Sequence, residues 1–223
     1  MAVLGSAPPF VRCEWVRGLS VELGRVPEAE RLADWLAALS DSCGARFVVI
    51  DGPQAWKDEA NGLVHQRRCE RALATQAKTG PPGRVLPGTQ RRFTLLSIAL
   101  FDSLARRGFP RFDPARPCAR AALEVFPTAS WRALGRRPLP GKRRSSPAQL
   151  AGAAEFLRRQ CGLRFRGAPT HDELQAAVAG LAGLALCGHP GLTWTAHGTP
   201  PAQVGGTWRE GVIGLASLSN SSR

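Results

Sequence analysis

The chain has 223 residues, of which 43% are hydrophobic and 21% charged, so it is long enough to bury a core without disulfide or metal support. Its 24 glycines and 18 prolines follow no period, which excludes a collagen-like chain, and no apolar run reaches the roughly 18 residues of a membrane span. Thirty Lys and Arg residues against 17 Asp and Glu give a formal net charge of +13, which favours a polyanionic partner such as nucleic acid.

The N-terminal part of the chain predicts strands and a helix. Met1–Leu4 and Glu14–Val21 are candidate short strands. From Pro27 the apolar residues recur at helical spacing, and Gly44 ends that helix. Phe47–Asp51 follows at once, and its four consecutive apolar residues are typical of a strand buried on both faces of an α/β sheet.

The middle of the chain predicts a long loop, a helix and a second buried strand. Residues 53–90 are polar, and we expect a functional loop there with a short helix near 65–76. Thr94–Arg107 is an apolar-rich helix, and Ala121–Phe126 is a second apolar run of strand length. A basic loop over residues 128–146 follows this strand.

The C-terminal part predicts two capped helices and a last strand. Ser146-Pro147 has the residues of an N-cap and a first turn, and the helix runs to about Cys161. Thr170-His171-Asp172-Glu173 is a capping box that opens a helix over Leu174–Leu186. Gly211–Leu218 is a candidate last strand.

The alternation of strands and helices predicts a single α/β domain over residues 1–223, with a mostly parallel sheet covered on both faces and the basic loop as an insertion. The six cysteines are spread evenly and form no CxxC pair. We therefore expect reduced, mostly buried thiols in a cytoplasmic protein. No signal peptide and no membrane partner are expected, and no protein partner can be inferred.

Three carboxylates stand out by their surroundings. Asp51 ends one apolar strand, Glu124 lies inside the other, and Asp172 falls in the first turn of a helix. A buried carboxylate usually has a cation, a set of hydrogen bonds or a metal, because burying it alone is costly. Carboxylate oxygens are ligands of Mg²⁺ and Mn²⁺, and acids from strand ends and a helix can hold two ions for phosphoryl transfer.

Each of these acids also has a structural explanation. Asp51 can bond to the amides of the turn that follows it. Glu124 can pair with a buried arginine such as Arg68 or Arg120. Asp172 can simply favour the helix dipole.

The basic loop has two interpretations. In the first it is a phosphate-contacting arm with Trp131 as a stacking aromatic, and in the second it is a solvated loop whose Trp131 packs on the core. Because 27 of the 30 basic residues are Arg, a GC-rich coding bias is an alternative explanation of the charge. The residues expected to contact nucleic acid are Arg68, Arg132, Arg136, Arg137, Lys142, Arg143 and Arg144.

Five motifs occur in the order of a known family. They are Val48–Pro53, Arg68–Arg71, Glu124–Pro127, Lys142–Arg144 and His171–Ala177, and the tail segment Glu210–Ile213 is similar to the family's closing strand. Over roughly residues 46–215 the chain resembles the domain of unknown function 429 (DUF429) family, whose members are regarded as predicted ribonuclease-H-like nucleases.

The resemblance implies a ribonuclease-H-like fold and hydrolysis of phosphodiester bonds in nucleic acid. Asp51, Glu124 and Asp172 would be the catalytic acids and would hold Mg²⁺ or Mn²⁺. The family's first strand carries an Asp, whereas here Ser6 is the nearest polar residue, so that strand is degenerate or missing. The alternative is therefore a non-catalytic nucleic-acid-binding relative that has lost the complete metal site. A third possibility, an enzyme acting on a small phosphorylated substrate, has no phosphate-binding loop to support it.

Overall fold

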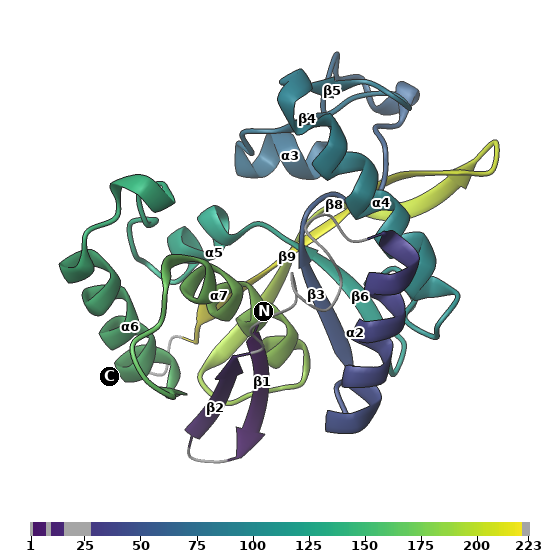
Figure 1. Ribbon diagram of the computed structural model, residues 1–223. Coiled ribbons are helices and arrows are strands. Elements are labelled where there is room, and N and C mark those ends of the chain that lie inside the picture. The colour runs from purple at the N-terminus through teal and green to yellow at the C-terminus, as the bar shows by residue number, and fades with distance from the viewer. Residues whose placement is uncertain (1, 8–9, 16–27, 220–223) are drawn as a thin grey trace. The chain divides into compact units, whose positions relative to one another are not determined.

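A computed structural model describes residues 2–7, 10–15 and 28–219 (Figure 1). The chain forms two compact units. Unit 1 comprises residues 1–19, 126–195 and 215–223, and unit 2 comprises residues 20–125 and 196–214. A single ribonuclease-H-like domain over the whole chain stays a prediction.

Unit 2 contains the two strands that the apolar runs predict. β3 (Phe47–Asp51) pairs in parallel with β6 (Ala121–Val125), so the prediction that they are neighbouring strands of one sheet is confirmed. β9 (Thr207–Leu218) pairs in parallel with β6, and β8 (Leu192–Val204) is the outer strand in the order β3-β6-β9-β8. A turn at Gly205-Gly206 joins β8 to β9, as in an antiparallel hairpin. The sheet is therefore mixed and mostly parallel, which is consistent with a ribonuclease-H-like α/β fold.

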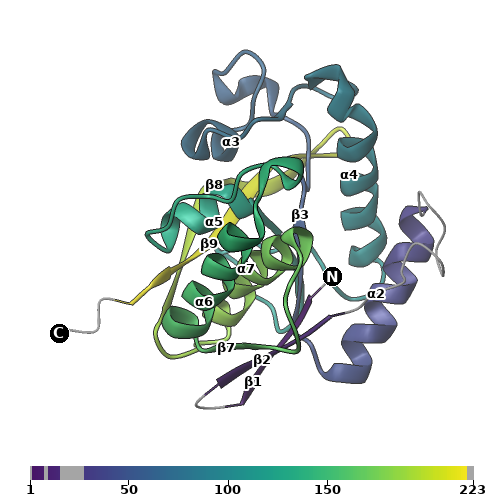
Figure 2. The same ribbon diagram turned by 60° about the vertical axis from the view of Figure 1, so that its left-hand side comes forward.

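Two helices cover one face of this sheet. α2 (Ala29–Cys43) and α4 (Arg91–Ala105) lie side by side in both views (Figures 1 and 2). They share a core with β3 and β6, formed by Ala33, Val48, Leu100, Phe101, Leu104, Phe109 and Ala122. The backbone of Gly44, at φ 65°, ends α2 in the left-handed conformation, as the sequence predicts.

Short elements build the segment that the sequence predicts as a long loop. The expected short helix is α3, which is only six residues long. A two-stranded antiparallel pair lies in the same segment and is not apparent from the sequence. In chain order the elements are η1 (Glu59–Asn61), α3 (Arg68–Leu73), β4 (Lys78–Thr79), β5 (Val85–Leu86) and η2 (Gly88–Gln90).

Unit 1 contains a separate three-stranded sheet. β1 (Ala2–Ala7) pairs antiparallel with β2 (Phe10–Trp15), and β7 (Leu163–Phe165) pairs in parallel with β2. A first strand is thus present, and Ser6 lies in it opposite Val11. β1 belongs to a different sheet from β3, so Ser6 is not on a neighbouring strand of Asp51. Of the strand expected at 14–21, only Glu14 and Trp15 lie in β2, which begins earlier, at Phe10, and residues 16–21 lie outside the described residues.

The helices of unit 1 correct the expectation of a basic loop. α5 (Pro127–Ala133) and the 3₁₀ turn η3 (Lys142–Arg144) occupy much of residues 128–146. α6 (Pro147–Cys161) and α7 (His171–Leu186) follow. Both helices begin at capping boxes, Ser146 with Gln149 and Thr170 with Glu173. The sequence predicts the second box and, for the first, the N-cap Ser146 alone.

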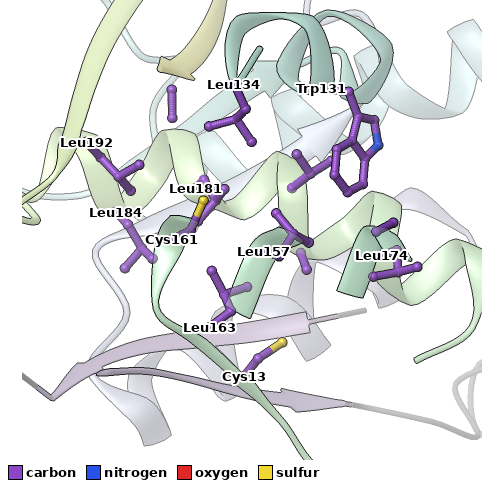
Figure 3. Packing of buried hydrophobic residues seen from close by; sticks show 14 of the residues in the cluster. Cys13, Trp131, Leu134, Leu157, Cys161, Leu163, Leu174, Leu181, Leu184 and Leu192 are labelled. Carbon is purple, nitrogen blue, oxygen red and sulfur yellow. The ribbon is translucent and has the colours of Figure 1, made fainter. Parts of the chain in front are cut away.

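Side chains of α5, α6, α7, β2 and β7 meet in one hydrophobic cluster (Figure 3). Trp131, Leu157 and Leu181 are fully buried there, beside Cys13 and Leu163. α7 approaches β1 so closely that a Cβ at Gly180 would lie 2.6 Å from Leu4 Cδ1, so a glycine fits this position best. None of the helices in the described ranges is long and apolar enough to cross a membrane.

Candidate functional site

Glu124 is buried in β6 of unit 2, and its partner is Arg67. Only 2% of Glu124 and 1% of Arg67 is exposed. Arg67 Nη2 donates to Glu124 Oε1 at 2.6 Å and Nη1 donates to Oε2 at 2.8 Å. Burial raises the pKa of Glu124, while Arg67 acts in the opposite direction. The prediction of a buried arginine partner is correct in kind, but the residue is neither Arg68 nor Arg120.

Glu70 holds Arg67 in this position. Arg67 is the residue before α3, and its backbone N–H donates to Glu70 Oε2 at 3.0 Å. Glu70 Oε1 accepts from Arg67 Nε, also at 3.0 Å, and the backbone N–H of Thr79 donates to the same carboxylate. The third residue of a short helix therefore fixes both the backbone and the guanidinium of the residue before that helix.

The turn after β3 supplies the remaining contact to Glu124. The backbone N–H of Gln54 donates to Glu124 Oε2 at 2.9 Å. Gln54 is fully buried, and its side chain donates from Nε2 to the carbonyl of Val212 at 2.8 Å. Arg111 Nε donates to the carbonyl of Gln54 at 2.8 Å and Nη2 donates to Asp102 at 2.8 Å, which fixes the turn.

Asp51 is the last residue of β3, and although part of its surface is exposed, its carboxylate is closely surrounded by protein atoms. The residue opposite Glu124 in the sheet is Ile50, not Asp51. Because successive side chains alternate between the faces of a strand, this register assigns Asp51 and Glu124 to opposite faces of the sheet. Loss of hydration raises the pKa of Asp51 to about 6, and the negative charge of Glu124 acts in the same direction.

These carboxylates do not fit a shared metal ion. Both oxygens of Glu124 are taken by Arg67 and Gln54, and the guanidinium charge lies where a cation would bind. Within the described residues, no three His, Cys, Asp or Glu side chains form a group that could hold a metal. Asp172 belongs to unit 1 and the other two acids to unit 2, so the expected convergence of Asp172 with them stays a prediction.

Asp172 has partners within unit 1. It lies in the first turn of α7 and forms an ion pair with Lys142. His171 Nδ1 lies 3.1 Å from Asp172 Oδ1, and His171 Nε2 lies 3.0 Å from the carbonyl of Pro140. Lys142, with a smaller contribution from His171, lowers the pKa of Asp172. These contacts join the turn around Pro140 to the start of α7.

The residues around η3 form the basic segment, residues 132–144. Trp131 is fully buried and donates from Nε1 to Gln175 at 2.7 Å, so it is a core residue and not a stacking platform. Arg136 is partly buried over the ring of Phe156. Four exposed arginines have no acidic partner among the described residues: Arg132, Arg137, Arg143 and Arg144.

The fold is a mixed α/β architecture with a buried cluster of acids around an arginine. The chain belongs to the family described as protein of unknown function (DUF429), because the family model matches residues 3–197 of its 223 residues. Comparison with curated proteins and with solved structures finds no match.

Sequence reasoning missed Arg67, although one signal for it was present. Arg67 precedes Glu70 by three residues, the spacing at which a helix N3 acid reaches back to the residue before the helix. This spacing indicates that, of Arg67 and Arg68, Arg67 is the one that Glu70 can hold in place. Arg68 is exposed on α3, and Arg120 pairs with Asp41 and lies over the ring of Phe109.

Proposed function

We propose that this protein is a non-catalytic, nucleic-acid-binding member of its family. The observation that carries the proposal is the pair between Glu124 and Arg67, in which a carboxylate at a family motif position is bound by an internal cation. Glu124 then stabilises the protein and has no oxygen left for a metal.

The charge distribution supports nucleic acid as the partner. Unit 1 has 13 Lys and Arg residues against 4 Asp and Glu, a net charge of +9, so it carries most of the +13 of the chain. Such an excess attracts a polyanion and releases counterions from it on binding. The four unpaired arginines of the basic segment are the residues we expect to contact phosphates.

The basic segment is better suited to contacts with the phosphate backbone of a nucleic acid than to recognition of its bases. Arg143 and Arg144 lie in a 3₁₀ turn, and their guanidinium groups are exposed. Arginine forms two parallel hydrogen bonds to a phosphate, which fixes position on a strand but does not distinguish its sequence. Because Trp131 is buried, the segment offers no stacking contact from that residue. We therefore propose binding with little sequence preference.

The test is the salt dependence of binding to fluorescently labelled DNA and RNA oligonucleotides, measured by anisotropy. We expect binding by the wild-type chain that weakens steeply between about 50 and 200 mM salt. In Arg143→Ala/Arg144→Ala the slope of log K against log salt should become shallower by about 1.4–1.8, since roughly 0.7–0.9 is lost per phosphate contact.

The matched control removes the same charge elsewhere. Arg91→Ala/Arg92→Ala takes two exposed arginines from the start of α4 in unit 2. It should leave the slope close to that of the wild type. If the two double variants change the slope equally, or if the wild-type chain does not bind at the lowest salt, the basic segment is not the interface. The arginine excess would then be explained by coding bias.

A further inference from the structure

A small polar cavity lies in unit 2, whereas the basic segment belongs to unit 1. Its volume is about 270 Å³, and its walls come from the turn around η1, from α3 and from the hairpin β8–β9. The polar residues that line it are Asp58, Asn61, Arg68, Thr199, Arg209 and Glu210. The lining thus contains two guanidinium groups and two carboxylates.

The carboxylates of the cavity are already bonded to groups of the protein. Glu210 Oε1 accepts from the backbone N–H of Asp58 at 3.0 Å and from Asn61 Nδ2 at 2.5 Å. Glu210 Oε2 accepts from the backbone N–H of Arg68 at 2.9 Å. Asp58 Oδ1 accepts from the N–H of Ala60 at 2.9 Å. Neither carboxylate forms an ion pair with the arginines of the cavity.

By contrast, neither of the two arginines has a side-chain partner among the described residues, and of the two only Arg209 has an atom shielded from water, since Arg68 is exposed. Among the described residues, no hydrogen bond or ion pair is made by the side chain of Arg68 or of Arg209. Arg209 Nη1 is moreover buried from water without a partner. A buried donor without an acceptor is unfavourable, so a ligand that accepts from Arg209 would remove this cost.

The backbone at Glu210 is also unusual. Its φ is +57°, in the left-handed region that non-glycine residues rarely adopt. The bond from Glu210 N–H to the carbonyl of Trp56 at 2.7 Å, together with the three donors on its carboxylate, holds this conformation. Strained residues of this kind cluster at binding sites, and Glu210 lines the cavity together with its chain neighbour Arg209.

We infer that this cavity binds a phosphate group, with Arg68 and Arg209 as its ligands and the hydroxyl of Thr199 as a further donor. Two guanidinium groups without partners are matched by a group with several acceptor oxygens and a double negative charge. The cavity is larger than a phosphate alone, so it has room for part of an attached sugar. The inference rests on the proposed function in taking that phosphate from a nucleotide or a nucleic-acid strand.

The test is isothermal titration of the full chain with three probes: inorganic phosphate, a nucleoside 5′-monophosphate and an oligonucleotide with a 5′-phosphate. Arg68→Met and Arg209→Met remove the charge and keep much of the side-chain stem. We expect each to weaken the binding of the first two probes by about tenfold or more, as loss of a charged hydrogen-bond pair predicts. Comparing the affinities for the nucleoside monophosphate and for the 5′-phosphorylated oligonucleotide shows whether the cavity prefers a free nucleotide or the end of a strand.

Arg71→Met is the matched control, because Arg71 is exposed on the same helix and does not line this cavity. It should bind phosphate like the wild type. If Arg209→Met fails to fold, Arg68→Met decides, since the bond from its backbone N–H to Glu210 does not need the side chain. Unchanged affinity in Arg68→Met, or an equal loss in Arg71→Met, would overturn the inference.

The same titrations separate this inference from the proposed function. Arg143→Ala/Arg144→Ala should weaken the oligonucleotide alone and leave inorganic phosphate unaffected. If Arg143→Ala/Arg144→Ala weakens only oligonucleotide binding while Arg68→Met leaves the affinity for phosphate unchanged, the cavity is not a phosphate site. The basic segment then remains the proposed nucleic-acid interface. If phosphate binding depends on Arg68 but no oligonucleotide binds, the cavity is a nucleotide site and the proposed function is wrong.

Discussion

Arg67 and Glu124 lie 57 residues apart in the chain and form a two-point ion pair inside unit 2, with N–O distances of 2.6 and 2.8 Å. Neither residue has more than 2% of its surface exposed. A buried pair of this kind contributes little net stability over an apolar pair, but removing one partner leaves a buried charge uncompensated. The pair therefore explains why an acid can lie in the middle of an apolar strand.

Arg67→Met should destabilise the protein strongly, because Glu124 and Glu70 would both lose their cation. We expect a loss of about 3–5 kcal/mol in the free energy of unfolding, measured by urea denaturation. Arg71→Met, which changes an exposed arginine on α3, should cost no more than about 0.5 kcal/mol. A similar small loss in both variants would mean that Arg67 is not needed to neutralise Glu124.

The turn that carries Gln54 depends on a glycine in β9. Gly211 has φ +118°, and a Cβ there would lie 2.6 Å from Gln54 Cδ. Gly211→Ala should therefore displace Gln54 and reduce the free energy of unfolding by about 1–3 kcal/mol more than the control. The control is Gly206→Ala, at φ +73° with open space around the new methyl group. Equal losses would show that the close approach to Gln54 is unimportant.

Asp51 should give the stability a pH dependence. Its pKa of about 6 in the folded protein lies above the ordinary value of 3.8, so the folded state binds the proton more tightly than the unfolded state. Below about pH 3.8 Asp51 is protonated in both the folded and the unfolded state, so it does not lower the free energy of unfolding. As the pH rises, ionised Asp51 lowers the free energy of unfolding by a growing amount, and this loss is complete above about pH 6. Asp51→Asn should therefore raise the melting temperature more at about pH 7.5 than at about pH 4.

Thermal unfolding of wild type and Asp51→Asn at both pH values checks this sign. Glu59→Gln, which removes an exposed carboxylate from η1, is the control for a general effect of lost negative charge. If Asp51→Asn raises the melting temperature equally at both pH values, or more at the lower pH, the pKa of Asp51 is not raised in the folded protein.

The parts of the fold that the sequence predicts are those with a local signal. β3 and β6 are short, mostly apolar runs, and α6 and α7 begin at capping boxes whose partners are only three residues apart in the chain. β8 was missed because it contains Pro200-Pro201 and alternates irregularly between buried and exposed residues. Its place in the sheet depends on pairing with β9 and not on its own composition.

The candidate site was predictable only in part, for a related reason. That Glu124 needs a partner follows from its apolar neighbours, but which arginine provides it depends on how α3 packs in unit 2. Trp131 shows the same limit, because its buried position is set by the cluster of α5, α6 and α7 and not by the basic residues beside it in the chain. Residues that are close in the sequence predict local structure, whereas the contacts between side chains far apart in the sequence depend on the tertiary fold.

The most direct test of the account is to incubate the protein with labelled single- and double-stranded DNA and RNA in the presence of Mn²⁺ or Mg²⁺, and to measure binding and cleavage in the same samples. Because Arg67 and Gln54 occupy the carboxylate of Glu124, the account predicts oligonucleotides that are bound at low salt and remain intact with either metal. Cleavage that requires the metal and is lost in both Asp51→Asn and Glu124→Gln would contradict it.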